Sequence, residues 1–312
     1  MALTAALLAG DLDAWRRECA LLVRGTPIND AVRAFDVDAL RRELAAGVSP
    51  DFRDEGDELA WTPLFSAVTY CSGTCETAFI AERAACVVAL LEAGASVAAQ
   101  SLGGETALQC AVSHHAFGDI IDLLIAAGSD VNNVNSEGES VLATAAQEGS
   151  AATVKKLISA GATGLDDALV RAASYPSANS VRNCALLLRS GAALPTEETL
   201  RNMTTDENWR YHGGDDDERL LIRRARTYLE RVNATPGGFQ AYEREHRQRL
   251  TAVFADKFPA LPVEVISHIV LLWAHCGDYD QDYAVPRAAH WRLISEQIER
   301  DREAAAADAE EN

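Results

Sequence analysis

Short aliphatic runs recur along the first two thirds of the chain, and each is followed by a glycine. Residues 87–91 and 120–124 place aliphatic side chains at i, i+3 and i+4, the spacing of one helix face. A glycine after such a run suits the left-handed residue that closes a helix. Successive glycines are 47, 34, 33 and 30 residues apart, at Gly47, Gly94, Gly128, Gly161 and Gly191. The pattern therefore predicts a repeated helical unit of about 33 residues with one long insertion.

A second phrase precedes each of these glycines. It begins with Thr, Ser or Asp, whose side chain can accept the free amide hydrogens of a first helical turn. Proline often follows, which has no amide hydrogen to leave unpaired. An alanine comes three residues after the aliphatic position, where a small side chain lets neighbouring helices approach. The phrases are Thr26-Pro27-Ile28 with Ala31, Thr62-Pro63-Leu64 with Ala67, Thr106-Ala107-Leu108 with Ala111, Ser140-Val141-Leu142 with Ala145, and Asp167-Ala168-Leu169 with Ala172.

Together these phrases resemble the ankyrin repeat over roughly residues 2–194, because T-P-L-H-x-A opens the inner helix of that family. The resemblance implies an all-α-dominated solenoid of helix pairs with short β-hairpin fingers, and it makes residues 2–25 a degenerate capping repeat. The interval from Gly161 to Asp167 is only 6 residues, so we expect a truncated finger there. An insertion of 11 residues is expected between the two helices of the second unit, around residues 70–83.

The last third of the chain follows a different pattern. Residues 194–203 and 216–232 can form one further helix pair, and Pro236-Gly237-Gly238 then breaks the helical pattern. We therefore expect three parts: residues 1–235 as the solenoid with degenerate terminal caps, 236–302 as a helical C-terminal region, and 303–312 as an acidic disordered tail.

Within that C-terminal region, residues 258–300 resemble an F-box segment. The L-P-x-E-h-h-x-x-I pattern matches Leu261, Pro262, Glu264, Val265, Ile266 and Ile269, and residues 287–294 resemble the tryptophan-containing helix of that module. The resemblance implies that Leu261, Pro262, Ile266 and Ile269 dock a ubiquitin-ligase adaptor. The alternative is that these residues belong to an amphipathic helical cap on the solenoid.

Charge and cysteine usage limit the classes of partner. The chain has 28 Lys and Arg against 47 Asp and Glu, a net charge of −19, which argues against nucleic acid or an anionic membrane as partner. No segment approaches the roughly 18 apolar residues that a membrane span needs. The seven cysteines do not form a disulfide framework, so we expect a cytoplasmic, or nuclear, protein in a reducing compartment.

Sequence motifs for chemistry are weak, and we expect no catalytic residues, no cofactor and no metal. No nucleotide-binding, hydrolase or metalloprotease motif is present. A zinc or redox site is conceivable around Cys71 and Cys75, with Cys86, Cys110, His114 and His115. A nucleophile and base are conceivable at His275, Cys276 and Asp278, or at Glu243, Glu245 and His246. Arg219, Arg223 and Arg226 share one helix face, either as solvated side chains or as a phosphate or acidic-partner site.

In the ankyrin family the concave surface binds proteins, so the resemblance implies a non-enzymatic interaction module or scaffold. The alternative is a substrate receptor of a cullin-type ubiquitin ligase. The family's variable contact positions fall on the fingers at Gln100, Leu102, Glu105, Val134, Ser136, Glu137 and Glu139, and on inner-helix ends at Tyr70, Ser113, His114, Gln147, Glu148 and Tyr175. Because four of these are glutamates, we expect a protein partner of basic character.

Overall fold

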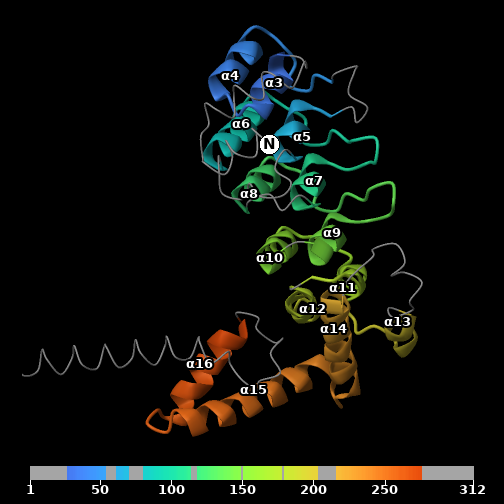
Figure 1. The fold of residues 1–312 in the computed structure, drawn as a ribbon, viewed down its shortest axis with the longest axis vertical. Coiled ribbons are helices and arrows are strands. Elements are labelled where there is room, and N and C mark those ends of the chain that lie inside the picture. Colours follow the sequence, from blue (N-terminus) through green and yellow to red (C-terminus); the bar gives the residue numbers. More distant parts are fainter. Residues whose placement is uncertain are drawn as a thin grey trace, which may run out of the picture. The chain divides into compact units, whose positions relative to one another are not determined.

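The computed structural model describes residues 27–53, 61–69, 80–113, 118–148, 150–177, 179–202 and 216–275. These residues are mainly helical (Figure 1). In chain order the helices are α3 (Pro27–Arg33), α4 (Val37–Ala45), α5 (Pro63–Thr69), α6 (Ile80–Glu92), α7 (Ala107–Ser113), α8 (Gly118–Ala126), α9 (Val141–Glu148), α10 (Ala151–Ser159), α11 (Leu165–Ser174), α12 (Ser180–Arg189), α13 (Glu197–Asn202), α14 (Asp216–Ala234), α15 (Gly238–Lys257) and α16 (Val263–His275).

The helices from α3 to α12 stack as antiparallel pairs in two rows (Figure 1). The inner row is α3, α5, α7, α9 and α11, and the outer row is α4, α6, α8, α10 and α12. Each inner helix packs on its outer partner and on the inner helices before and after it. The predicted all-α solenoid is therefore confirmed.

Three inner helices begin as the sequence predicts and one does not, while Thr26, the residue predicted to cap α3, lies outside the described residues. The hydroxyls of Thr62, Thr106 and Ser140 accept amide hydrogens from the first turns of α5, α7 and α9. The prediction for Asp167 is wrong, because α11 starts at Leu165 and Asp167 lies inside its first turn. The residue before α11 is Gly164 in a left-handed conformation (φ 76°), which the shortened connection requires.

All five glycines predicted to close outer helices have positive φ, between 86° and 104°. The five alanines predicted at the inner-helix contacts are buried. These residues alternate in the core with fully buried leucines such as Leu64, Leu108 and Leu142. The core is mainly aliphatic, and Phe35 and Phe65 are its fully buried aromatic side chains.

The predicted insertion lies largely outside the described residues, and α6 already begins at Ile80. Arg83 in α6 is buried, and its guanidinium donates to the carbonyl oxygens of Ala67 (2.8 Å) and Val68 at the end of α5. Those carbonyls have no partner within a helix of seven residues. Arg83 therefore stabilises the end of α5 from the neighbouring outer helix.

Extended strands are absent from the described residues, so the predicted β-hairpin fingers are loops. Each of two loops is closed by one antiparallel bridge, between Gln100 and Thr106 and between Val134 and Ser140. We call loop 99–106 the first finger and loop 133–140 the second finger.

A side-chain clasp joins neighbouring repeats at the base of these loops. In each pair, the accepting carboxylate or amide side chain lies four or five residues after one helix-ending glycine. The amide hydrogen that it accepts belongs to the residue two positions after the next helix-ending glycine. The pairs are Asp51 with Ser96 (2.8 Å), Asn132 with Thr163 (2.8 Å) and Asp166 with Ala193 (2.7 Å).

The chain divides into two compact units between Arg244 and Glu245, inside α15. The boundary expected near residue 236 lies before this division, at the turn between α14 and α15, and stays a prediction. In the first unit, α14 packs on α11 and α12, and Arg189 of α12 ion-pairs with Glu243 at 2.6 Å. In the second unit, Ile266 and Val270 of α16 pack on Leu250 of α15.

Candidate interaction surface

Side chains along the second finger alternate between buried and exposed. Asn133 is buried and Asn135 is half-buried, whereas Val134 and Ser136 are exposed. In an extended chain successive side chains point to opposite faces. One face of this finger is therefore directed toward the inner helices, and the other is directed away from them.

Three large hydrophobic side chains of the first unit's described residues are exposed, and all lie between the helix pairs. Leu102 is 74% exposed at the turn of the first finger, and Val134 is 52% exposed on the second. Phe52, in the connection after α4, is 36% exposed. Exposed apolar groups gathered on one kind of element favour an interaction surface.

Direct hydrogen bonds hold the two fingers together. The Ser136 amide donates to the Gly103 carbonyl oxygen (2.8 Å), and the Asn133 amide side chain donates to the Gly104 carbonyl oxygen (3.1 Å). Gly104 has φ 73°, and a Cβ there would lie 3.1 Å from the Ser136 backbone nitrogen. Glycine is required both by this backbone conformation and by the close approach of the next finger.

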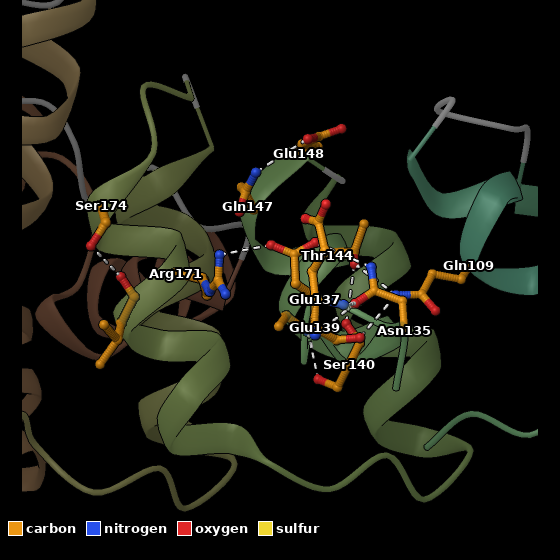
Figure 2. Close-up of polar contacts among 12 residues, drawn as sticks. Gln109, Asn135, Glu137, Glu139, Ser140, Thr144, Gln147, Glu148, Arg171 and Ser174 are labelled. Carbon is orange, nitrogen blue, oxygen red and sulfur yellow. Dashed lines mark hydrogen bonds and ion pairs between the residues drawn. The ribbon is translucent and has the colours of Figure 1, made fainter. Parts of the chain in front are cut away.

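A network of side-chain amides, in which Asn133 and Gln109 are buried and Gln100 is exposed, fixes the fingers to the inner helices. Gln100 donates to Asn133 Oδ1 (2.9 Å), and Asn133 donates to Gln109 Oε1 (2.9 Å) on α7. Gln109 Nε2 donates in turn to the Glu139 carbonyl oxygen (3.0 Å) and lies 3.4 Å from Thr144 Oγ1 on α9 (Figure 2). Because the members satisfy one another in a low-dielectric interior, the fingers are held rigidly.

Glu139 is part of this internal network. Its carboxylate accepts hydrogen bonds from Arg171 Nη1 on α11 (2.8 Å) and from Asn135 Nδ2 (3.4 Å), as Figure 2 shows. Asn135 Oδ1 also accepts the amide hydrogens of Glu137 and Glu139. The charge of Glu139 is therefore balanced within the solenoid, although the residue was predicted to contact a partner.

The other predicted finger glutamates differ in their surroundings. Glu137 is exposed at the turn of the second finger. Glu105 is half-buried, and the Cys110 thiol donates to its carboxylate at 3.7 Å. Glu137 is therefore the finger carboxylate best placed to meet a partner's cation.

The predicted inner-helix residues lie at the C-terminal ends of α7, α9 and α11. Ser113 is half-buried and donates to the Gln109 carbonyl oxygen, and Gln147 donates to Glu148 (3.2 Å; Figure 2). Tyr175, directly after α11, is also half-buried. Tyr70 and His114 lie outside the described residues.

Sequence reasoning missed Gln109, Asn133 and Arg171. Gln109 stands where the family phrase has histidine, directly after Leu108, and that position is a detectable signal for a polar group in the inner helix. Asn133 and Arg171 carry no such signal, because their partners lie 24 and 32 residues away along the chain.

The described residues do not assemble the conceivable zinc site. Cys86 and Cys110 are buried in α6 and α7, and burial raises the pKa of the Cys110 thiol, with the Glu105 carboxylate adding to the shift. Cys71, Cys75, His114 and His115 lie outside the described residues. In the part that the structure describes, no group of three or more His, Cys, Asp or Glu side chains is placed to hold a metal ion.

The structure describes only part of the conceivable catalytic and phosphate sites, and the side chain of Arg219 is not among the described ones. Cys276 and Asp278 lie outside it, and Glu243 is engaged by Arg189. On α14, Arg226 ion-pairs with Glu230 at 2.7 Å, while Arg223 is exposed.

The predicted adaptor-docking residues have unequal exposure. Leu261 and Ile269 are 41% and 42% exposed, and Pro262 is also exposed, whereas Ile266 is buried against α15.

Among the helices of the described residues, none is both long and apolar enough to cross a lipid bilayer.

Comparison with known proteins gives one positive finding. A family model described as ankyrin repeats (3 copies) matches residues 77–166, which include both fingers and the helices α6 to α10. A search of the curated proteins finds no match to the chain. The chain therefore carries ankyrin repeats, with residues 77–166 matching the family.

Proposed function

We propose that this chain is a non-enzymatic scaffold or interaction module that binds a protein partner through its fingers and inner-helix ends. The observation that carries the proposal is the position of Leu102 and Val134. They are exposed on fingers that the Asn133 side chain holds to each other and to Gln109 of α7. A rigid surface loses little conformational entropy on binding, so its exposed apolar area contributes more fully to affinity.

Charge supports a partner of basic character. The chain has a net charge of −19, and Glu137 is exposed beside the apolar positions. Complementary charge accelerates encounter and favours correct partners more than it adds affinity.

The experiment is affinity capture with the full-length chain and two fourfold variants, followed by mass spectrometry. The surface variant carries Leu102→Asp, Val134→Asp, Gln147→Tyr and Ser174→Tyr. The control introduces the same four residue types on exposed positions of the outer helices α8 and α10, namely Ala126→Asp, Ala152→Asp, Lys155→Tyr and Ser159→Tyr. Because Lys155 is replaced, the control becomes more negative than the surface variant by one further charge.

We expect the captured partner to fall at least tenfold with the surface variant and to stay within twofold with the control. Circular dichroism must show equal helicity in all three proteins. Equal capture by the surface variant and the wild type would contradict the proposal.

The charge component has its own test. Glu137→Lys should weaken capture several-fold, whereas Glu92→Lys, at the exposed end of the outer helix α6, should not. Glu139 is left unchanged because removing it would break its pair with Arg171 and disturb the fold. Equal effects of the two substitutions would show that only total charge matters.

A second candidate function is adaptor docking in a ubiquitin ligase, through the second unit. It is favoured by the exposure of Leu261 and Ile269 within the second unit, since exposed apolar side chains that lie near one another favour an interface. Leu261→Asp with Ile269→Asp should remove a cullin-adaptor protein from the captured set and leave the finger-dependent partner. If no ligase component is captured by the wild type either, this second function is wrong.

A further inference from the structure

The two faces of the fingers differ in their side chains, which are hydrogen-bonded on one face and exposed on the other. The face toward the inner helices holds Asn133, Asn135 and Glu139, and all three are hydrogen-bonded within the solenoid. The opposite face and the finger turns hold Leu102, Val134 and Ser136, which are exposed. The apolar surface without a partner is therefore on the tips and outward face of the fingers.

Resting on the function proposed above, we infer that the partner lays an extended segment across the tips and outward face of both fingers. This segment carries two aliphatic side chains four residues apart, which contact Leu102 and Val134, and a basic residue next to them that meets Glu137.

The distance between Leu102 and Val134, the two anchors, determines how far apart the two aliphatic residues of the partner segment lie. Each finger consists of two antiparallel segments joined by one bridge. Segments bridged in this way lie about 4.8 Å apart, so equivalent positions on adjacent fingers are about 10 Å apart. Ser136 is equivalent to Leu102, and Val134 comes two residues earlier, which adds an offset of about 7 Å along the finger. The two anchors are thus about 12 Å apart, close to the roughly 13 Å that four residues span in an extended chain.

The surface between the anchors argues against a helical partner. An amphipathic helix would bring a continuous apolar row, at i, i+4 and i+7, onto the surface. The two fingers contact each other through Gly103, Gly104 and the amide of Ser136, which offer no apolar side chain. An extended segment places side chains of the same face at i, i+2 and i+4, so its middle position can be polar.

The charges on the fingers determine where the basic residue of the partner segment binds. The carboxylate of Glu139 is balanced by Arg171, and that of Glu105 accepts from Cys110 on the helix-facing side. Glu137 remains exposed at the turn, one residue beyond Ser136. Arg53, the cation at the base of the first finger, donates to the Gln100 carbonyl oxygen, so a basic residue is favoured near Glu137 rather than near Gln100.

The test uses a random 12-residue peptide library displayed on phage and selected on the immobilised full-length chain. Individual selected peptides are then synthesised with a fluorescent label and measured by anisotropy against three proteins. These are the wild type, a finger variant (Leu102→Asp with Val134→Asp) and an inner-helix variant (Gln147→Tyr with Ser174→Tyr).

We expect selected peptides with aliphatic residues at i and i+4 and an Arg or Lys nearby. Their Kd should rise at least tenfold on the finger variant and less than twofold on the inner-helix variant. Glu137→Lys should raise the Kd several-fold, and the matched Glu92→Lys should not.

Other outcomes overturn the inference and separate it from the proposed function. Peptides blocked by the inner-helix variant alone, or peptides with helical i, i+4, i+7 spacing, would contradict it and leave the interaction function standing. Peptides that bind both variants as tightly as the wild type would contradict both proposals. No enrichment over an unloaded support would contradict the extended-segment inference.

Discussion

Gln109 is the buried centre of the network that joins both fingers to two inner helices. Its side-chain amide contacts Asn133, Thr144 and the backbone of Glu139, and it has no exposed surface. A buried polar group that loses its partner costs more than the hydrogen bond itself contributes, because its water contacts are not restored.

Replacing this hub should therefore destabilise the solenoid. Gln109→Ala leaves Asn133 and the Glu139 carbonyl without their partner, and we expect a loss of about 1–3 kcal/mol in the free energy of unfolding. Urea unfolding followed by circular dichroism measures it. Gln147→Ala, at a half-buried position, is the control and should stay within about 0.5 kcal/mol. A Gln109→Ala protein as stable as this control would contradict the role given to the network.

The buried thiols predict a dependence of stability on alkaline pH. Desolvation raises the pKa of Cys110 and of Cys184, so the folded state keeps these protons to a higher pH than the unfolded state. The stabilising contribution is complete below the unfolded thiol pKa of about 8.5 and is lost as pH rises above it.

Melting temperatures between pH 7 and pH 10 check this expectation. The wild type should lose stability over that range, and Cys110→Ala with Cys184→Ala should lose less, whatever the two substitutions cost at pH 7. Parallel melting curves for the two proteins would show that these thiols remain protonated in the unfolded chain too, against the expectation.

At the scale of elements, the clasp between repeats has one gap. Asp51, Asn132 and Asp166 each accept the amide hydrogen of a residue in the following repeat. The equivalent position after Gly94 is Ala98, which is exposed and cannot accept a hydrogen bond. The backbone amide that would donate to a side chain at position 98 belongs to Asp130, two residues after Gly128.

Filling this gap should stabilise the stack. Ala98→Asn places an amide oxygen where it can accept from the Asp130 backbone, and we expect a gain of about 0.5–1.5 kcal/mol. The reciprocal change, Asp51→Ala, should cost a similar amount. Thermal and urea unfolding measure both variants. If Asp51→Ala is neutral, the clasp does not contribute to stability.

The elements themselves were predictable, because their signals are local. Helix starts at Thr62 and Thr106 and helix ends at Gly94 and Gly128 follow from the chemistry of a few neighbouring residues. Asp167 was assigned wrongly as a cap because the start of α11 depends on how short the preceding connection is.

The finger network was not predictable from local signals. Gln109 and Asn133 are brought together by the stacking of two repeats, and sequence spacing says nothing about which side chains then meet. For the same reason Glu139 was expected to contact a partner, while the folded chain pairs it with Arg171. The exposure of Leu102 and Val134 depends on which face of each finger is occupied, and that too follows from the stack.

At the scale of the whole molecule, the net charge of −19 acts on the rate of association. Long-range attraction raises the association rate constant of a basic partner, and salt screens it over a distance of about 10 Å at 0.1 M.

Association with a basic partner segment should therefore slow as salt rises. Stopped-flow fluorescence with a labelled selected peptide should show an association rate constant at least fivefold lower at 0.5 M than at 0.05 M NaCl. The dissociation rate constant should change much less, because the apolar contacts are short-range. Equal association rates at both salt concentrations would show that charge does not guide the encounter.

The short connection between α10 and α11 sets a limit on the footprint of any partner. Only residues 160–164 separate the two helices, and Arg171 reaches Glu139 across this step. The fingers before it present loop edges, whereas the surface beyond it presents helix ends. A partner segment that continued past Glu139 would contact helix ends instead of loop edges. We therefore expect the residue types accepted in that segment to change at this point.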